Sequence, residues 1–165
     1  MPARSTGMRS ALTALFPPGR GGGEGVEYGY KGKGATIHLI VDGHGRPLNI
    51  ITTGAAGDER AQVHPLLTSL PQKPKILYAD KGYDADWLRY ECGDFGTTAH
   101  IPYRRFAGRK ASREPKAERW KVERCFAWLK AKYRRLCARY ERKMTPWRAF
   151  LSLAISFYWI KSLVR

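Results

Sequence analysis

Two acidic residues, Asp80 and Glu123, lie where the local sequence could position a carboxylate for chemistry. Asp80 comes directly after the apolar run 75–79, which has the length of a buried strand, and open α/β sheets place their ligands at such strand ends. Glu123 lies within a long amphipathic segment. Carboxylates bind Mg²⁺ together with water and phosphates, and two-metal phosphoryl transfer uses a small carboxylate cluster. Asp80 and Glu123 are therefore candidate catalytic residues and ligands of Mg²⁺ or Mn²⁺.

The segment 116–140 predicts one long helix that carries Glu123. Its apolar residues recur at the i, i+4, i+7 spacing of a buried stripe. The stripe consists of Val122, Phe126, Leu129, Tyr133, Leu136 and Tyr140.

A second line of side chains runs beside this stripe. Lys116, Arg119, Glu123 and Lys130 fall within about 60° of one another at 100° per residue. One interpretation is a solvated face with an ion pair between Arg119 and Glu123. The other is a metal-binding carboxylate beside cations that contact phosphates, with arginine as a fork and lysine as a point charge.

The charge of the chain is concentrated in its C-terminal part. The 165 residues carry a formal net charge of +16, and residues 1–100 hold 11 Lys and Arg against 10 Asp and Glu, whereas residues 101–165 hold 19 against 4. A field of that size favours a polyanionic partner, DNA above all, over an anionic membrane surface. Within a basic loop at 104–116, the residues suited to DNA phosphates are Arg104, Arg105, Arg109 and Lys110.

Composition also excludes some classes of protein. The apolar run 149–160 is interrupted by two serines and is too short to span a bilayer, so we expect no membrane partner. The three cysteines form no CxxC pair, which is typical of reduced thiols in a cytoplasmic protein.

The remaining segments predict an α/β domain. A hairpin is expected over 35–54, with Asp42 entering its turn, where an aspartate before glycine is ordinary turn chemistry. Helices are expected over 58–70, 85–92 and 147–164, the last packed against the sheet, and short strands over 75–79 and 97–102. Residues 1–33 are rich in glycine and predict a flexible arm ahead of one domain over 34–165.

Two motifs carry a resemblance to a known family. The segment Tyr78-Ala-Asp80-Lys-Gly-Tyr-Asp84 resembles the region around the second aspartate of bacterial insertion-sequence DDE transposases, of the insertion sequence four/five type superfamily. Arg119-x3-Glu123-x6-Lys130 is similar to the family's Tyr-x2-Arg-x3-Glu-x6-Lys signature, with Lys116 in the tyrosine position. The hairpin segment resembles the family as well.

The resemblance implies a ribonuclease-H-like mixed sheet with flanking helices. It implies DNA transposition, in which metal-dependent cleavage and strand transfer act on transposon ends and target DNA. By carry-over, Asp80 is the second aspartate and Glu123 the final glutamate of a triad, and Arg119 and Lys130 contact DNA. The family further implies a homo-oligomer on DNA and a bacterial, cytoplasmic and nucleoid-associated location.

One departure from the family changes the expected activity. The first catalytic aspartate of the family lies on the first strand, upstream of the hairpin, but residues 1–30 contain no aspartate. We therefore expect a C-terminal portion that lacks its first strand and has weak or no activity alone, with the missing residue supplied by an upstream frame product or lost. Asp42 and Glu27 are the first candidates for a third ligand if the chain proves active.

Two alternative functions remain open from the sequence. One is a non-catalytic, basic DNA-binding remnant of the same scaffold, which would not need Asp80 and Glu123 to share a cation. The other is a ribonuclease-H-like nuclease unrelated to mobile elements, which would not need the spacing from Arg119 to Lys130.

Overall fold

A computed structural model of the chain describes residues 7–104 and 116–164, with only the backbone described at 116–118. Six strands form the sheet, namely β1 (Arg9–Leu15), β2 (Glu27–Gly29), β3 (Gly32–Asp42), β4 (Pro47–Gly54), β5 (Ile76–Tyr78) and β6 (Thr98–His100). The α-helices are α1 (Val63–Thr68), α2 (Asp86–Asp94), α3 (Lys116–Lys132) and α4 (Met144–Leu163). Three short 3-10 turns, η1 (Arg60–Gln62), η2 (Lys81–Tyr83) and η3 (Arg134–Leu136), complete the described elements.

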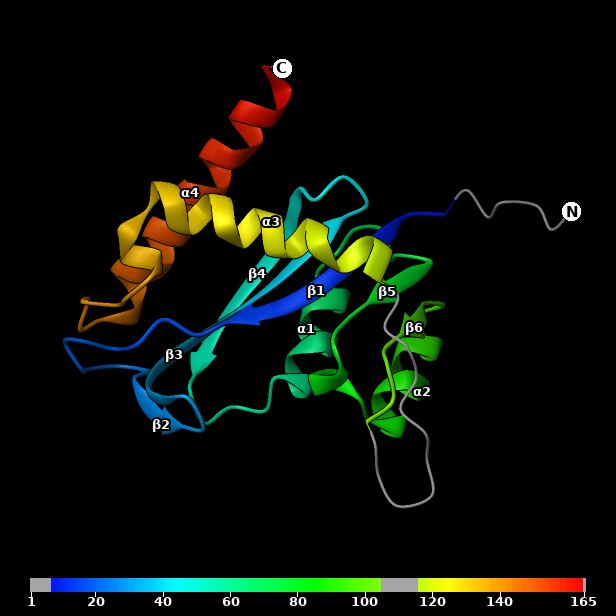
Figure 1. Cartoon of the computed structure of the whole chain (residues 1–165), viewed down its shortest axis with the longest axis horizontal. Coiled ribbons are helices and arrows are strands. Elements are labelled where there is room, and N and C mark those ends of the chain that lie inside the picture. The colour runs from blue at the N-terminus through cyan, green and yellow to red at the C-terminus, as the bar shows by residue number, and fades with distance from the viewer. Residues whose placement is uncertain (1–6, 105–115, 165) are drawn as a thin grey trace, which may run out of the picture.

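Strand β1 lies in the middle of the sheet (Figure 1). It pairs antiparallel with β3 on one side and parallel with β5 on the other, and β6 continues the parallel part. Strand β4 pairs antiparallel with β3, in the expected hairpin. The predicted mixed sheet with flanking helices is confirmed.

The glycine-rich N-terminal part is not only an arm. Strands β1 and β2 both lie within residues 1–33, and β3 begins at Gly32, ahead of the expected domain start. The expectation that the first strand is missing is therefore wrong. Its segment SALTAL contains several small residues, so its own strand signal is weak, and pairing with both β3 and β5 supplies what the local sequence lacks.

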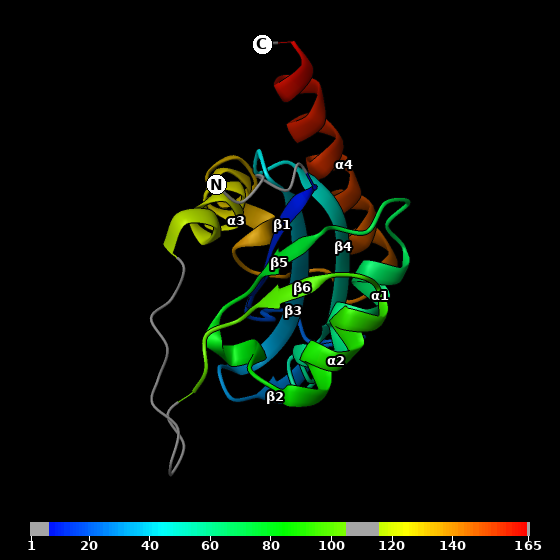
Figure 2. The same cartoon turned by 90° about the vertical axis from the view of Figure 1, so that its right-hand side faces the viewer.

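Two apolar cores lie on opposite faces of the sheet. Figure 2 shows α3 on one side of the strands and α1 and α2 on the other. Ala11 of β1 packs in the core with Val122 and Phe126 of α3, whereas its neighbour Leu12 packs in the core with α1 and α2. This alternation fixes which face each β1 residue occupies. Strand β3 is buried from Ala35 to Asp42, because both of its faces are covered.

The long helix is shorter than the sequence suggests. Helix α3 ends at Lys132, because Tyr133 adopts an extended conformation (φ −126°, ψ 91°) before the turn η3. Leu136 is nevertheless buried, reached through the turn rather than through a continuous stripe, while Tyr140 is exposed. The expectation of one helix over 116–140 is wrong beyond residue 132.

Helix α4 packs on the body through only part of its length. Trp147, Leu151 and Ala154 are buried, and the C-terminal half projects beyond the sheet (Figures 1 and 2). Apolar side chains on that half are exposed, so the expected full packing against the sheet is wrong there. They are Leu153, Phe157, Ile160, Leu163 and Val164. None of the helices in the described parts of the chain has the length and apolar character needed to cross a membrane.

Candidate active site

Asp80 lies two residues beyond the end of β5, as its position after an apolar run predicted. Its side chain is half-buried, and its Oδ1 accepts a hydrogen bond of 2.6 Å from the backbone N–H of Gly82, which caps η2. One oxygen of the carboxylate therefore holds the turn. No hydrogen bond to a described residue occupies the other oxygen, which leaves it available to a ligand.

Arg104 braces the turn that follows Asp80. Its guanidinium donates to the carbonyls of Lys81 (2.7 Å) and Gly82 (2.9 Å), and its backbone N–H donates to Oδ2 of Asp84 (2.7 Å). The sequence assigned Arg104 to DNA. In the structure its guanidinium donates to this turn, a positioning role that the sequence did not predict.

Asp84 also holds the loop that follows Asp80, through hydrogen bonds to its carboxylate. Burial alone would raise the pKa of its carboxyl group, but hydrogen bonds from the Arg104 backbone N–H and the Arg89 guanidinium (2.7 Å) outweigh burial and lower it. Asp84 is thus a charged anchor that accepts donors from α2 and from the start of the basic loop. The N-cap of α2 is the next residue, Ala85.

Glu123 lies on the exposed flank of α3. Its Oε1 accepts a hydrogen bond of 2.9 Å from the Arg119 guanidinium, four residues earlier, and its side chain is 56 % exposed. Lys130 is also exposed. The ion pair between Arg119 and Glu123, expected from the interpretation of this helix face as solvated, is therefore formed. It leaves Glu123 accessible to a ligand on the face of the sheet that α3 covers.

Thr13 is the residue that the sequence analysis missed. Ala11 and Tyr78 form the last pair of the parallel ladder between β1 and β5, and Thr13 and Asp80 each follow two residues later. Alternation along β1 turns Thr13 to the same face as Ala11, which packs against α3. The central strand therefore carries a hydroxyl, not a carboxylate, at the position where its register continues towards Asp80. Only the pairing of β1 with β5 reveals this position.

The donors present fall short of a complete carboxylate site. Among residues 7–104 and 119–164 no three His, Cys, Asp or Glu side chains gather as metal ligands. Asp80 follows a strand of the sheet and Glu123 lies on the helix α3. Two carboxylates and a threonine hydroxyl make a poorer Mg²⁺ site than three carboxylates.

Asp42 is committed to the hairpin turn. It is buried, and its two oxygens accept hydrogen bonds from the backbone N–H groups of His44 (2.8 Å) and Arg46 (2.9 Å) and from Nε of Arg46 (2.7 Å). The predicted turn chemistry is confirmed, which removes Asp42 as a third ligand. Glu27, the other candidate, is exposed on β2.

Part of the predicted DNA-binding set lies outside the described residues. Arg105, Arg109 and Lys110 belong to the range 105–115, and Lys116 begins α3 with its backbone alone described. Their assignment to DNA stays a prediction.

Comparisons with known proteins identify a family and two relatives. Residues 5–157 match the family model described as "Transposase DDE domain". A protein of Burkholderia cepacia named as a transposase for insertion sequence element IS402 is 35% identical over 130 residues, covering 73% of this chain and 60% of that protein. A Brucella ovis protein named as a transposase for element IS6501 is 33% identical over 129 residues, covering 76% of this chain and 97% of that protein.

A solved structure shares the fold. It is the piggyBac transposase in a synaptic complex with hairpin DNA, with a TM-score of 0.54 at 10% identity, covering 89% of this chain and 44% of that chain. At this identity the likeness concerns the fold, and it confirms the predicted ribonuclease-H-like class. The chain thus spans 60% of the length of the Burkholderia relative and under half of the piggyBac chain.

Proposed function

The chain belongs to the transposase DDE domain family, and we propose that it is the catalytic domain of a bacterial insertion-sequence transposase that binds DNA but cleaves it weakly or not at all alone. The observation that supports this most directly is the placement of Asp80 beyond β5 and of Glu123 on α3, the helix that covers one face of the sheet, while β1 carries Thr13 and no carboxylate. The placement matches the family order of two acidic residues. The missing charge at Thr13 supports the low activity.

DNA is the proposed substrate and partner, as transposon ends and as target. Nineteen Lys and Arg against four Asp and Glu over residues 101–165 give this half of the chain the field that phosphates require. Beside the carboxylates, Arg119 and Lys130 occupy the same flank of α3 and would contact DNA as it enters the site.

The family generally uses divalent metal ions, and we propose Mg²⁺ or Mn²⁺ here. Such an ion supplies charge stabilisation at the phosphate under attack. In this chain, Asp80 and Glu123 would hold it, while the Gly82 N–H fixes the orientation of Asp80 through Oδ1. With a hydroxyl at position 13, we expect weak affinity for the ion.

Assembly and location are part of the proposal. The exposed apolar side chains at 153, 157 and 160 of α4, and at its C-cap residue 164, recur at alternating spacings of four and three, the seam that a second helix covers in a coiled coil. This supports a homo-oligomer on DNA, in the bacterial cytoplasm and at the nucleoid.

The test measures binding and cleavage separately. Three proteins are compared: the purified chain, Asp80→Ala and Glu123→Ala. Fluorescence anisotropy measures their affinity for a DNA duplex at several salt concentrations. Nicking is measured by incubating each protein with supercoiled plasmid and Mg²⁺ or Mn²⁺. We expect salt-sensitive DNA binding by all three, Mn²⁺ binding by calorimetry that weakens in both variants, and little nicking by any.

Three results would contradict the proposal in different ways. Absence of DNA binding would overturn the transposase function itself. Strong metal-dependent nicking, lost in both variants, would overturn the low activity and require a third ligand elsewhere in the chain. Mn²⁺ affinity equal in all three would instead favour the non-catalytic DNA-binding remnant.

A further inference from the structure

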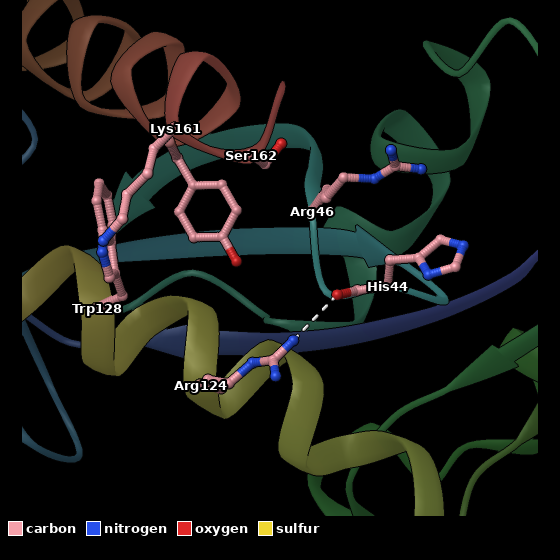
Figure 3. A pocket seen from close by; sticks show the side chains of 7 residues that line it. His44, Arg46, Arg124, Trp128, Lys161 and Ser162 are labelled. Atoms are coloured by element: carbon pink, nitrogen blue, oxygen red, sulfur yellow. Dashed lines mark hydrogen bonds between the residues drawn. The ribbon is translucent and has the colours of Figure 1, made fainter. Parts of the chain in front are cut away.

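A hollow of about 440 Å³ opens between the hairpin turn, α3 and α4 (Figure 3). The turn contributes His44 and Arg46, α3 contributes Arg124 and Trp128, and α4 contributes Lys161. Its lining therefore combines aromatic rings with four basic residues and contains no carboxylate. A space of this size accepts a small anionic group.

Hydrogen bonds that join the hairpin turn to α3 and α4 fix the walls of the hollow. Tyr158 of α4 donates its hydroxyl to the carbonyl of Gly45 (3.0 Å), and Trp159 donates its indole N–H to the carbonyl of Pro47 (2.8 Å). From α3, the Arg124 guanidinium donates to the carbonyl of His44 (3.1 Å), as Figure 3 shows. The hairpin turn is thus held between the two helices, and the hollow is a fixed feature of the packing.

The cations in the hollow are not equally neutralised. Arg46 forms an ion pair with Asp42 (2.6 Å). Arg124 lies over the ring of Trp120 (4.5 Å to its centroid), and the Lys161 Nζ lies over Trp128 (5.3 Å). No ion pair within the described parts of the chain joins Arg124 or Lys161 to a carboxylate. Aromatic faces position these two cations without cancelling their charge.

The hollow is separate from the candidate active site. At 100° per residue, Arg124 and Trp128 lie on the flank of α3 opposite to Arg119, Glu123 and Lys130, with the buried stripe between the two flanks. DNA that contacts only the carboxylate flank would leave Arg124 and Lys161 unused.

We propose that this hollow binds a backbone phosphate of a DNA strand, held between Arg124 and Lys161. The inference rests on the proposed DNA binding and adds a second point of attachment on the far side of α3. An arginine fork and a lysine point charge, both free of acidic partners and backed by rings, are suited to a phosphate. The site reads no base sequence, so its contribution is to position the DNA.

The test uses Arg124→Gln and Lys161→Gln in the full chain. Glutamine at 124 retains an N–H donor for the His44 carbonyl, which protects the packing of the turn. Lys143→Gln is the matched control, because Lys143 is exposed at the other end of α4, 18 residues or about 27 Å from Lys161 along the helix. Affinity for a labelled duplex is measured by anisotropy over a range of salt concentrations.

Each pocket variant should lower the steepness of the salt dependence. Because the two residues hold a single phosphate, loss of this contact reduces the slope of log K against log salt by about 0.9 at most, in either variant. In parallel, bound DNA should protect Lys161, but not Lys143, from chemical acetylation detected by mass spectrometry.

The outcomes separate this inference from the proposed function. Suppose that the wild-type chain binds DNA. If the pocket variants keep the slope of its salt dependence, or if Lys143→Gln lowers that slope equally, the hollow is not a phosphate site. The transposase function would still stand. If the wild-type chain does not bind DNA, both are overturned. Competition by inorganic phosphate at millimolar concentration, without protection of Lys161 by DNA, would identify a free-anion site and overturn the DNA assignment.

Discussion

Thr13 and Asp80 each lie two residues beyond the last pair of the parallel ladder between β1 and β5, which joins Ala11 to Tyr78. The pair joins a residue near the N-terminus to one in the middle of the chain, and β3 holds β1 in register on its other side through the pairing of Thr13 with Leu39. This register predicts that a side chain at position 13 points towards the space beside the Asp80 carboxylate. It is the place where one substitution could complete a three-carboxylate site.

Thr13→Asp should create a functional metal site. A third carboxylate beside Asp80 and opposite Glu123 supplies the ligand that the hydroxyl lacks. We expect the dissociation constant for Mn²⁺ to fall by about tenfold or more, equivalent to 1.4 kcal/mol, and plasmid nicking to become metal-dependent. Calorimetry and the plasmid assay check the two effects.

Thr13→Asn is the control for this substitution, because the amide has nearly the same shape as aspartate without its charge. Adding Glu123→Gln to Thr13→Asp should remove the gain. Equal Mn²⁺ affinity in the aspartate and asparagine variants would show that position 13 does not face the ion.

Gly82→Ala should displace Asp80 with little effect on stability. A Cβ at residue 82 would lie 2.6 Å from Oδ1 of Asp80, the oxygen that accepts the Gly82 N–H, so the carboxylate must rotate away. We expect the Mn²⁺ affinity gained by Thr13→Asp to be lost in the double variant. The melting temperature measures whether the fold is retained.

Gly93→Ala serves as the matched control. Gly93 lies in α2, and a Cβ there meets no atom within 4 Å. Alanine should raise the stability by about 0.5–1 kcal/mol through helix propensity and leave metal affinity unchanged. A loss of metal affinity in both glycine variants would trace the effect to the fold in general.

Asp42→Asn should destabilise the chain without acting on the active site. The buried carboxylate accepts two backbone N–H groups and the Arg46 guanidinium, and an amide cannot accept all of these donors. Because Arg46 is partly exposed and water can solvate it, we expect a loss of about 2 kcal/mol in the free energy of unfolding. Denaturant titration measures the loss. Unchanged stability combined with lost Mn²⁺ binding would instead identify Asp42 as a ligand.

The sequence predicted the elements whose signal is local. The hairpin, the strand that ends before Asp80 and the ion pair of Arg119 with Glu123 depend on alternation, on apolar runs and on helical spacing, all of which are read within a few residues. The apolar character of β5 shows that it is buried, whatever its partners are.

What the sequence missed depends on contacts between distant segments. Strand β1 owes its place to β3 and β5, so Thr13 could not be matched with Asp80 before the register was known. The apolar spacing continues through Leu136, but the chain leaves the helix at Tyr133 and still buries Leu136 through η3. The apolar spacing predicts which residues are buried. It does not predict that Leu136 is buried through a turn and not through the helix.

His38→Gln should flatten the acid side of the stability profile. His38 lies in the buried middle of β3, where its Nε2 and the Thr53 hydroxyl are 2.8 Å apart, and burial lowers its pKa from 6.5 to about 4. Between these values the unfolded chain binds a proton that the folded chain does not, so stability falls as the pH falls from 6.5 towards 4. At pH 4 this proton uptake lowers the free energy of unfolding by about 3 kcal/mol relative to its value at neutral pH.

Glutamine keeps a hydrogen-bonding group near Thr53 and cannot titrate, so it removes the contribution of His38 to the pH dependence of stability. The carboxylates, which also titrate in acid, are the same in both proteins. The free energy of unfolding of both proteins is measured by denaturant titration at half-unit steps from pH 7.5 to 4. The difference between wild type and His38→Gln should shift by about 3 kcal/mol in favour of the variant as the pH falls. A difference that stays constant over this range would mean that His38 is protonated in the folded chain, and that the buried middle of β3 is open to water.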